Sequence, residues 1–340
     1  MTKILLILTG GTIGSEKKKN IVNVSKRNNL LKSLLSNKIN KKIDFKITQP
    51  INIQSENALP KDWNKIIKSI EENWKDNFSG IIITHGTDTL SYTASALSQY
   101  FFNFYKPVVF VSSDKPLNDK KSNGKSNFIS AVEFIRRFEL PGTYVPYKNP
   151  ENNFVSFFIG SRVKQIGGYK NNLDNSYGDQ FCIYKNKKFF FKKKNNPSIK
   201  LIKKRGKKRK LNTKFRFTDK LVLINPYPGL NYNFFNLNRL KPKAILHTLY
   251  HSGTSSLRFI NFIKKNKRKK INFYVAPVSE KKKNIYLSFK ILKDLKVKSL
   301  KGITVETAFA KISLAYGSFK NKKDINAFLN KNNFFEKNSF

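Results

Sequence analysis

Hydroxyl and carboxyl side chains follow two apolar segments that predict buried strands. Thr12 lies in a glycine-rich turn after residues 4–8, and Thr87 and Asp88 lie in a similar turn after residues 81–83. A threonine hydroxyl attacks an amide only when a neighbouring group takes its proton and other groups stabilise the tetrahedral oxyanion. Either turn alone is also typical of a helix cap, because Thr and Asp cap helices well. Two such turns together favour a hydrolytic site with a threonine nucleophile.

The elements that must position these turns alternate between strands and helices. This alternation predicts an α/β fold, with a larger N-terminal domain built on a doubly wound, mostly parallel sheet. In such sheets ligands bind at the carboxyl ends of the strands, which makes the two turns candidates for one shared site. In this part of the chain, the expected strands are 3–9, 45–47, 81–83, 107–111 and 155–159, and the expected helices are 30–35, 61–74, 91–104 and 127–138.

A basic segment divides the chain into three parts. We expect an N-terminal domain over residues 1–182, an exposed basic hairpin and linker over 183–214, and a smaller C-terminal α/β domain over 215–340. The basic segment carries the aromatic residues 189–191, and basic segments with aromatic residues can bind single-stranded nucleic acid. A solvated linker is the simpler interpretation of such a run of charge.

Composition limits the possible partners and cofactors. The chain has 67 Lys and Arg against 21 Asp and Glu, a formal charge of +46. This charge is spread along the chain, so we expect nucleic acid to bind nonspecifically at most. The single cysteine, Cys182, excludes an internal disulfide and favours the reducing cytoplasm. The sequence predicts no signal peptide, no membrane helix and no metal site, since His247 and His251 are too few to form one.

The two turns resemble the paired signature motifs of the bacterial-type L-asparaginases, and most closely those of the cytoplasmic type I group. They read TGGTIG at 9–14 and HGTDT at 85–89. The resemblance covers nearly the whole chain and implies L-asparagine as substrate, no cofactor, and a homodimer or homotetramer. Further matching segments are 50–63, 92–97, 106–109, 122–127, 227–229 and 304–306.

The resemblance also implies catalytic roles. Thr12 would attack the side-chain amide and form an acyl-enzyme. Thr87, Asp88 and a lysine would form the proton relay, in which a desolvated lysine takes a proton through Thr87. Lys170 is the best-placed lysine in the sequence, and Lys164 is its competitor.

Other residues are implied to hold the substrate. Ser55 would bind the α-carboxylate, and Asp88 and Glu56 would face the α-ammonium. Glu306, supplied by a neighbouring subunit, would help to hold the same ammonium. His85 would support its turn rather than act as a base.

The sequence departs from the family pattern at several positions, which include Glu56, Asn57, Ser112, Ser113 and Thr254. Two further departures bear on catalysis. The flap after the first motif lacks its usual tyrosine, and Ile21 stands near that position. The loop at 164–170 lacks the usual Arg and Thr-Thr-Lys.

Three functions therefore remain open. The first is asparagine hydrolysis. The second is the amidase subunit of a Glu-tRNA amidotransferase, favoured by the basic linker but lacking that subunit's usual N-terminal extension. The third is a catalytically eroded homologue, favoured by the two departures.

Overall fold

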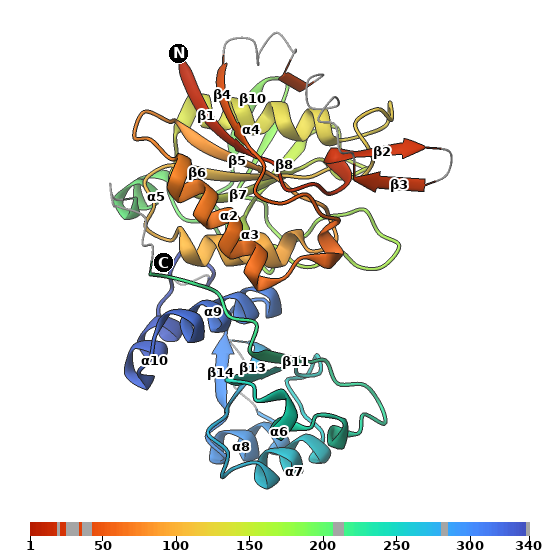
Figure 1. Cartoon of the computed structure of the whole chain (residues 1–340), viewed down its shortest axis with the longest axis vertical. Coiled ribbons are helices and arrows are strands. Elements are labelled where there is room, and N and C mark those ends of the chain that lie inside the picture. Colours follow the sequence, from red (N-terminus) through yellow and green to blue (C-terminus); the bar gives the residue numbers. More distant parts are fainter. Residues whose placement is uncertain (19–20, 25–33, 36–42, 207–213, 280–284, 338–340) are drawn as a thin grey trace.

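The computed structural model has two lobes (Figure 1). It describes residues 1–18, 21–24, 34–35, 43–206, 214–279 and 285–337. The large lobe is built on an eight-stranded sheet and the small lobe on a four-stranded sheet. Within the described parts of the chain, none of the helices has both the length and the apolar character needed to span a membrane.

The sheet of the large lobe has the strand order β10-β9-β8-β7-β6-β5-β1-β4. The neighbours from β4 to β7 pair in parallel, and β8, β9 and β10 complete the sheet by antiparallel pairing. The predicted mostly parallel sheet is thus confirmed. Its strands are β1 (Thr2–Ile7), β4 (Ile43–Thr48), β5 (Gly80–Thr84), β6 (Pro107–Val111), β7 (Gly142–Tyr147), β8 (Val155–Ile159), β9 (Cys182–Lys185) and β10 (Lys188–Phe191).

Helices cover both faces of this sheet. Leu5 and Ile7 of β1 pack in the same core cluster as α2 (Pro60–Asn73) and α3 (Leu90–Tyr100), whereas Ile4 and Leu6 pack in the same cluster as α4 (Gly124–Phe138). Strands buried on both faces read as continuous apolar runs, which is why β1 and β5 were recognisable in the sequence. Short 3₁₀ turns follow several strands: η1 (Thr12–Gly14), η3 (Ser55–Asn57) and η4 (Gly160–Arg162).

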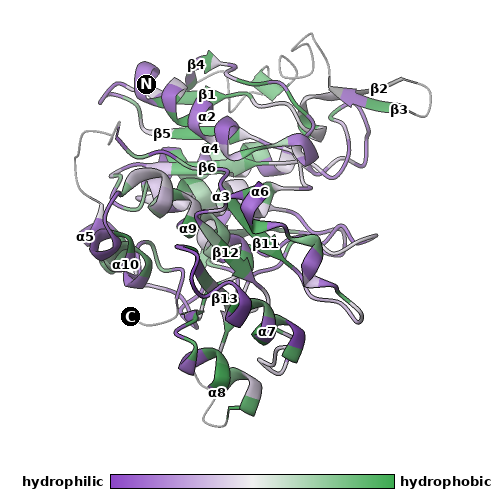
Figure 2. Cartoon of the chain, turned by 60° about the horizontal axis from the view of Figure 1, so that its bottom comes forward, coloured by the Kyte–Doolittle hydropathy of each residue, from purple (hydrophilic) through white to green (hydrophobic). Residues whose placement is uncertain are grey.

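The small lobe is a parallel sheet in the order β11-β12-β13-β14. Helices α7 and α8 pack in one core cluster with β12 and β13, and α9 shares the other cluster with these strands and with α3. Figure 1 shows α9 between the two lobes, and Figure 2 shows hydrophobic residues along the strands of both sheets. Its elements are β11 (Leu221–Ile224), η5 (Tyr232–Phe234), α6 (Leu237–Leu240), β12 (Ala244–His247), α7 (Leu257–Lys265), β13 (Asn272–Val278), α8 (Leu287–Asp294), β14 (Lys298–Lys301), α9 (Val305–Ser318) and α10 (Lys322–Asn330).

The basic segment is more ordered than the sequence suggested. Its hairpin extends the large sheet as β9 and β10, and a short helix, α5 (Ile199–Arg205), follows. Phe189 and Phe191 pack against the core cluster of the large lobe, while Phe190 points outward and is 49% exposed. Because both strands belong to the large sheet, we propose that the boundary between the lobes lies after Phe191 rather than at Cys182.

Other elements also differ from the sequence prediction. The segment after the first motif, expected as a loop or flap, contains a hairpin of β2 (Ser15–Lys18) and β3 (Ile21–Val24). Strands β7 and β14 and helix α8 were not predicted. The helix expected at 30–35 falls largely outside the described residues.

The C-terminal segment returns to the large lobe. Phe334 accepts a hydrogen bond from Ser161 Oγ at 2.9 Å, and its ring would lie 2.1 Å from a Cβ placed on Gly142. Glu336 forms a fully buried ion pair of 2.6 Å with Lys311 of α9. The residues after α10 therefore pin α9 against the large lobe.

Candidate active site

The turns that follow β1 and β5 leave the sheet side by side. These strands are parallel neighbours, with Ile7 opposite Ile83. Thr9 and Thr84 then join them directly, since Thr9 Oγ1 donates to Thr84 O at 2.5 Å and Thr9 N donates to Thr84 Oγ1 at 3.4 Å. The two signature turns thus begin side by side at the carboxyl ends of β1 and β5, where hydrogen bonds between Thr9 and Thr84 hold them together.

Two glycines then let the turns touch. Gly11 has a φ of +70°, and a Cβ on it would lie 2.2 Å from Gly86 N. Such an approach is possible only without a side chain. Thr12 and Thr87 each follow one of these glycines by one residue and are half-buried. The structure therefore brings together the two turns that the sequence singled out.

A third loop completes the cluster. Ser55 of η3 is buried, its Oγ donates to Asp88 Oδ2 at 3.4 Å, and its carbonyl oxygen accepts from Thr89 Oγ1 at 2.7 Å. A Cβ on Gly86 would lie 2.5 Å from Ser55 Oγ. Glu56 follows Ser55 in the same turn and is exposed. Three predicted substrate-binding residues, Ser55, Glu56 and Asp88, thus lie on adjoining loops.

His85 is placed as a support for its turn. Its backbone N–H donates to Val111 O at 2.9 Å, and its Nδ1 hydrogen-bonds Gly86 O at 2.8 Å. A carbonyl oxygen only accepts, so the Nδ1 atom carries the proton. Burial lowers the pKa of His85 to about 4, which leaves the ring neutral at neutral pH. The ring therefore holds the backbone of the turn in place.

The two candidate lysines lie on an exposed loop. Lys170 closes a turn in which its N–H donates to Gly167 O at 3.2 Å, and the Lys164 N–H donates to Asp174 O at 3.0 Å. Both residues are exposed. Among the described residues, no ion pair joins either ammonium group to Asp88. Their assignment to the proton relay stays a prediction.

Gln165 connects this loop to the signature turns. Its Nε2 donates to the Asp88 carbonyl oxygen, and its Oε1 accepts from Ser91 Oγ at 2.7 Å. Its backbone N–H donates to Glu306 Oε1 at 2.6 Å. No local sequence pattern marks Gln165 as a site residue, because an isolated glutamine matches no motif and its hydrogen-bond partners are far away along the chain.

Glu306 lies in the first turn of α9 and is 3% exposed. Burial, together with the charge of Glu306, raises the pKa of Tyr92 to about 12, so the carboxylate lies close to α3. The contact that the structure shows is made within the chain, through Gln165.

Comparison with known proteins agrees with this geometry. Residues 3–165 match the family profile described as Asparaginase, N-terminal. This match places residues 3–165 in the asparaginase family.

Individual relatives extend the similarity. An L-asparaginase of Thermococcus kodakarensis is 32% identical over 164 residues, which are 48% of each chain. A glutamyl-tRNA(Gln) amidotransferase subunit of Sulfurisphaera tokodaii is 26% identical over 280 residues, which are 80% of this chain and 60% of the relative. The chain thus spans less than two thirds of the length of these curated relatives. The crystal structure of L-asparaginase I from Vibrio cholerae shares the fold, with a TM-score of 0.77 at 22% identity over 99% of both chains.

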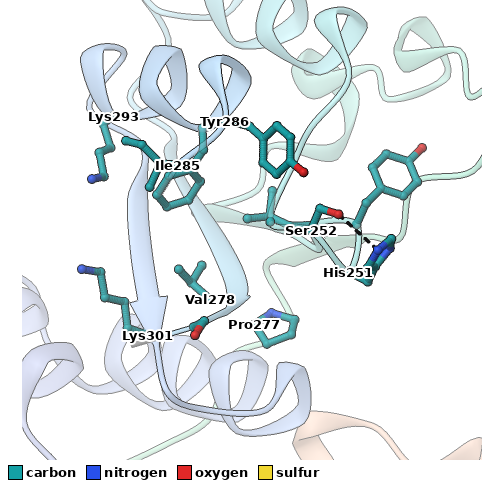
Figure 3. A pocket seen from close by; sticks show the side chains of 13 residues that line it. His251, Ser252, Pro277, Val278, Ile285, Tyr286, Lys293 and Lys301 are labelled. Carbon is teal, nitrogen blue, oxygen red and sulfur yellow. Dashed lines mark hydrogen bonds between the residues drawn. The ribbon is translucent and has the colours of Figure 1, made fainter. Parts of the chain in front are cut away.

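Among the hollows lined by described residues, two involve the small lobe. One, of about 740 Å³, lies between the lobes and is lined in part by Lys164, Gln165, Glu306 and His251. The other, of about 150 Å³, lies in the small lobe, where Tyr286 and Ser252 line one side and the ammonium groups of Lys293 and Lys301 line the other (Figure 3). The second hollow contains none of the predicted site residues. No group of three or more metal-ligating side chains is found in the described parts of the chain.

Proposed function

We propose that this protein hydrolyses the side-chain amide of L-asparagine to L-aspartate and ammonia. The observation that carries the proposal is the backbone contact between Gly11 and Gly86, which brings Thr12, Thr87 and Asp88 together beside Ser55. Membership of the asparaginase family and the similarity to an L-asparaginase support this choice of substrate.

In the proposed mechanism Thr12 Oγ1 attacks the amide carbon. The hydroxyl proton passes through Thr87 to a lysine, for which Lys170 is the first candidate and Lys164 the second. The tetrahedral intermediate collapses, its nitrogen is protonated and ammonia leaves, so that an ester to Thr12 remains. Water then attacks this ester, which releases L-aspartate and restores the Thr12 hydroxyl.

The substrate would be held by its two charged α-groups. We propose that Ser55 binds the α-carboxylate and that Asp88 and Glu56 face the α-ammonium. The buried carboxylate of Glu306 would act on the same end of the substrate through Gln165, which it contacts. The side chain of Asp88 is exposed, so it is accessible to a ligand.

The test is ammonia release from L-asparagine by the purified protein and by Thr12→Ala and Thr87→Ala. We expect each substitution to lower kcat by about 10³-fold, since each removes a part of a nucleophile and its relay. Thr248→Ala is a matched control, because it removes a threonine hydroxyl that bonds Asn225 in the small lobe at 3.1 Å. Activity that survives both substitutions would refute the mechanism.

A second proposal is the amidase subunit of a Glu-tRNA amidotransferase. It is supported by the amidotransferase relative, which this chain matches over 80% of its own length. The measurement is ammonia release with and without a partner protein and charged tRNA. No activity from the chain alone, together with activation by both additions, would favour this function over free asparagine hydrolysis.

Erosion of the active site is a third proposal, supported by the flap. Ile21 begins β3, in the hairpin that follows Thr12, and stands near the position where the family has a tyrosine. If Ile21→Tyr raises turnover, the absence of the tyrosine side chain from the flap has weakened an ancestral activity. If it does not, the flap of this chain works without a tyrosine.

We also propose a cytoplasmic homodimer or homotetramer. The cytoplasmic location is supported by a single, buried cysteine, which leaves no internal disulfide to be lost in a reducing compartment. The assembly is supported by family membership, and light scattering of the purified protein would measure it.

A further inference from the structure

Gln165 joins three segments that are far apart in the sequence. Its side-chain amide bonds the Asp88 carbonyl oxygen and the Ser91 hydroxyl, and its backbone N–H bonds Glu306 Oε1. Asp88 lies in the second signature turn, and Ser91 follows that turn in the sequence. Glu306 belongs to α9, which shares a core cluster with strands of the small lobe. One residue therefore links the signature turn to the helix between the lobes.

We propose that Gln165 is a positioning residue that fixes the orientation of Asp88 and so sets the affinity of the site for the α-ammonium of its amino-acid ligand. This inference rests on the proposed function, because it takes Asp88 as the group that faces the ammonium.

Asp88 itself makes two of the hydrogen bonds found among the described residues, one at its carboxylate from Ser55 Oγ and one at its carbonyl oxygen from Gln165 Nε2. Its side chain is exposed, and the hydrogen bond from Ser55 Oγ to Oδ2 is long, at 3.4 Å. The turn around it closes with an equally long bond of 3.4 Å from Leu90 N to Thr87 O. The bond from Gln165 Nε2 to the Asp88 carbonyl oxygen is the one that acts on the backbone of this residue. Releasing it frees the backbone that directs the carboxylate.

Gln165 is itself held by hydrogen bonds rather than by packing. The residue is exposed, and its backbone is fixed by the bond of 2.6 Å to the buried carboxylate of Glu306. An ionised acceptor makes a stronger hydrogen bond than a neutral one. The hydrogen bond to Glu306 of α9 thus fixes the backbone from which the Gln165 side-chain amide reaches Asp88.

A glutamine suits this position because its two terminal atoms have opposite roles. Nε2 must donate to a carbonyl oxygen, while Oε1 must accept from the Ser91 hydroxyl. A glutamate keeps the acceptor and loses the donor, and a methionine of similar length has neither as a strong group. These two substitutions separate the bond to Asp88 from the bond to Ser91.

The experiment compares Gln165→Met and Gln165→Glu with the parent protein. For L-asparagine we expect KM to rise about fivefold in Gln165→Met, the effect of one net hydrogen bond, with kcat changed less than twofold. Gln165→Glu should raise KM further, because a carboxylate oxygen then faces the Asp88 carbonyl oxygen. A rise in KM at constant kcat is the mark of lost uniform binding, which a general loss of structure does not produce. Gln180→Met makes the same chemical change elsewhere in the chain and should leave both constants unchanged.

Calorimetry with L-aspartate separates this inference from the proposed function. If the parent releases no ammonia but binds L-aspartate, and Gln165→Met binds it about fivefold more weakly, the positioning role stands without hydrolysis. In an Asp88→Asn background, Gln165→Met should change the affinity less than twofold, because the carboxylate that Gln165 is proposed to orient is then absent. An unchanged KM and Kd in Gln165→Met, a fall in kcat alone, or no binding of L-aspartate by the parent would each overturn the inference.

Discussion

The loops around the proposed site are held in two different ways. The signature turns are fixed by backbone contact, with Gly11 against Gly86 and both turns tied to the sheet through Thr9 and Thr84. The loop that carries the candidate lysines is exposed, and its described link to these turns is the side chain of one residue, Gln165.

This difference separates the part of the site that tolerates no added side chain from the part whose sequence can change without loss of the fold. Close backbone contact tolerates no side chain, so the signature turns carry a fixed pattern of glycines. A loop held by side-chain hydrogen bonds can change sequence while the fold stays intact, because each net bond contributes only about 1 kcal/mol. The departures from the family pattern include that loop and the flap, and none of them lies in the two signature turns.

The largest expected effect is that of Gly11→Ala. Its Cβ would lie 2.2 Å from Gly86 N, at a φ of +70°, so the two turns must separate. We expect a loss of about 4 kcal/mol or more in the free energy of unfolding, with loss of activity. Chemical denaturation measures the former.

Gly14→Ala is the matched control for this substitution. It lies in the same turn, and a Cβ there has no neighbour within 4 Å. We expect its free energy of unfolding to stay within about 0.5 kcal/mol of the parent value. Equal destabilisation by the two alanines would show that the contact between the turns is not what holds them.

The lysine loop gives the next largest effect. If Lys170 takes the proton from Thr87, Lys170→Met should lower kcat by about 10²- to 10⁴-fold, the typical contribution of a general base. Lys164→Met should then change kcat less than twofold, and both proteins should keep the stability of the parent because both side chains are exposed. The reverse order of the two kcat values would assign the relay to Lys164.

The last effect concerns acid, and it leaves the protein at neutral pH unchanged. Burial lowers the pKa values of His85 and His247 to about 4, below the ordinary value of 6.5. The unfolded chain therefore binds more protons between about pH 6.5 and pH 4, and stability falls as the pH falls through this window. Each histidine should contribute a loss of roughly 3 kcal/mol by pH 4.

Denaturation at several pH values measures this loss, and His247→Phe isolates the part due to His85. His247 stacks on Phe259 with ring centroids 3.7 Å apart, so a phenyl ring keeps this stacking. The variant loses the hydrogen bond of 2.8 Å between Tyr232 Oη and His247 Nε2, which lowers its stability at every pH and leaves the pH dependence to His85. We expect the variant to keep about half of the pH dependence of the parent. A pH dependence that disappears entirely would mean that the turn around His85 does not resist protonation.

Much of the large lobe could be predicted because burial on both faces leaves a plain sequence pattern. Residues 4–8 and 81–83 are continuous apolar runs, and each ends at a glycine turn. Strand β7 escapes prediction because its sequence, GTYVPY, contains a glycine and a proline, yet all six residues are buried. The basic segment 183–214 resembles a linker in sequence because its lysines outnumber the aromatic residues that pack inward.

The sequence by itself determined which turns carry the threonines, because glycines at fixed spacing after a buried strand reflect local backbone geometry. It also indicated the resemblance to the asparaginases and the α/β class. The tertiary structure alone decided which loops meet: Ser55 beside Asp88, Glu306 behind Gln165, and the two lysines on an exposed loop. These contacts join residues 33 to 141 positions apart, and no local pattern records a hydrogen bond between side chains that only folding brings together.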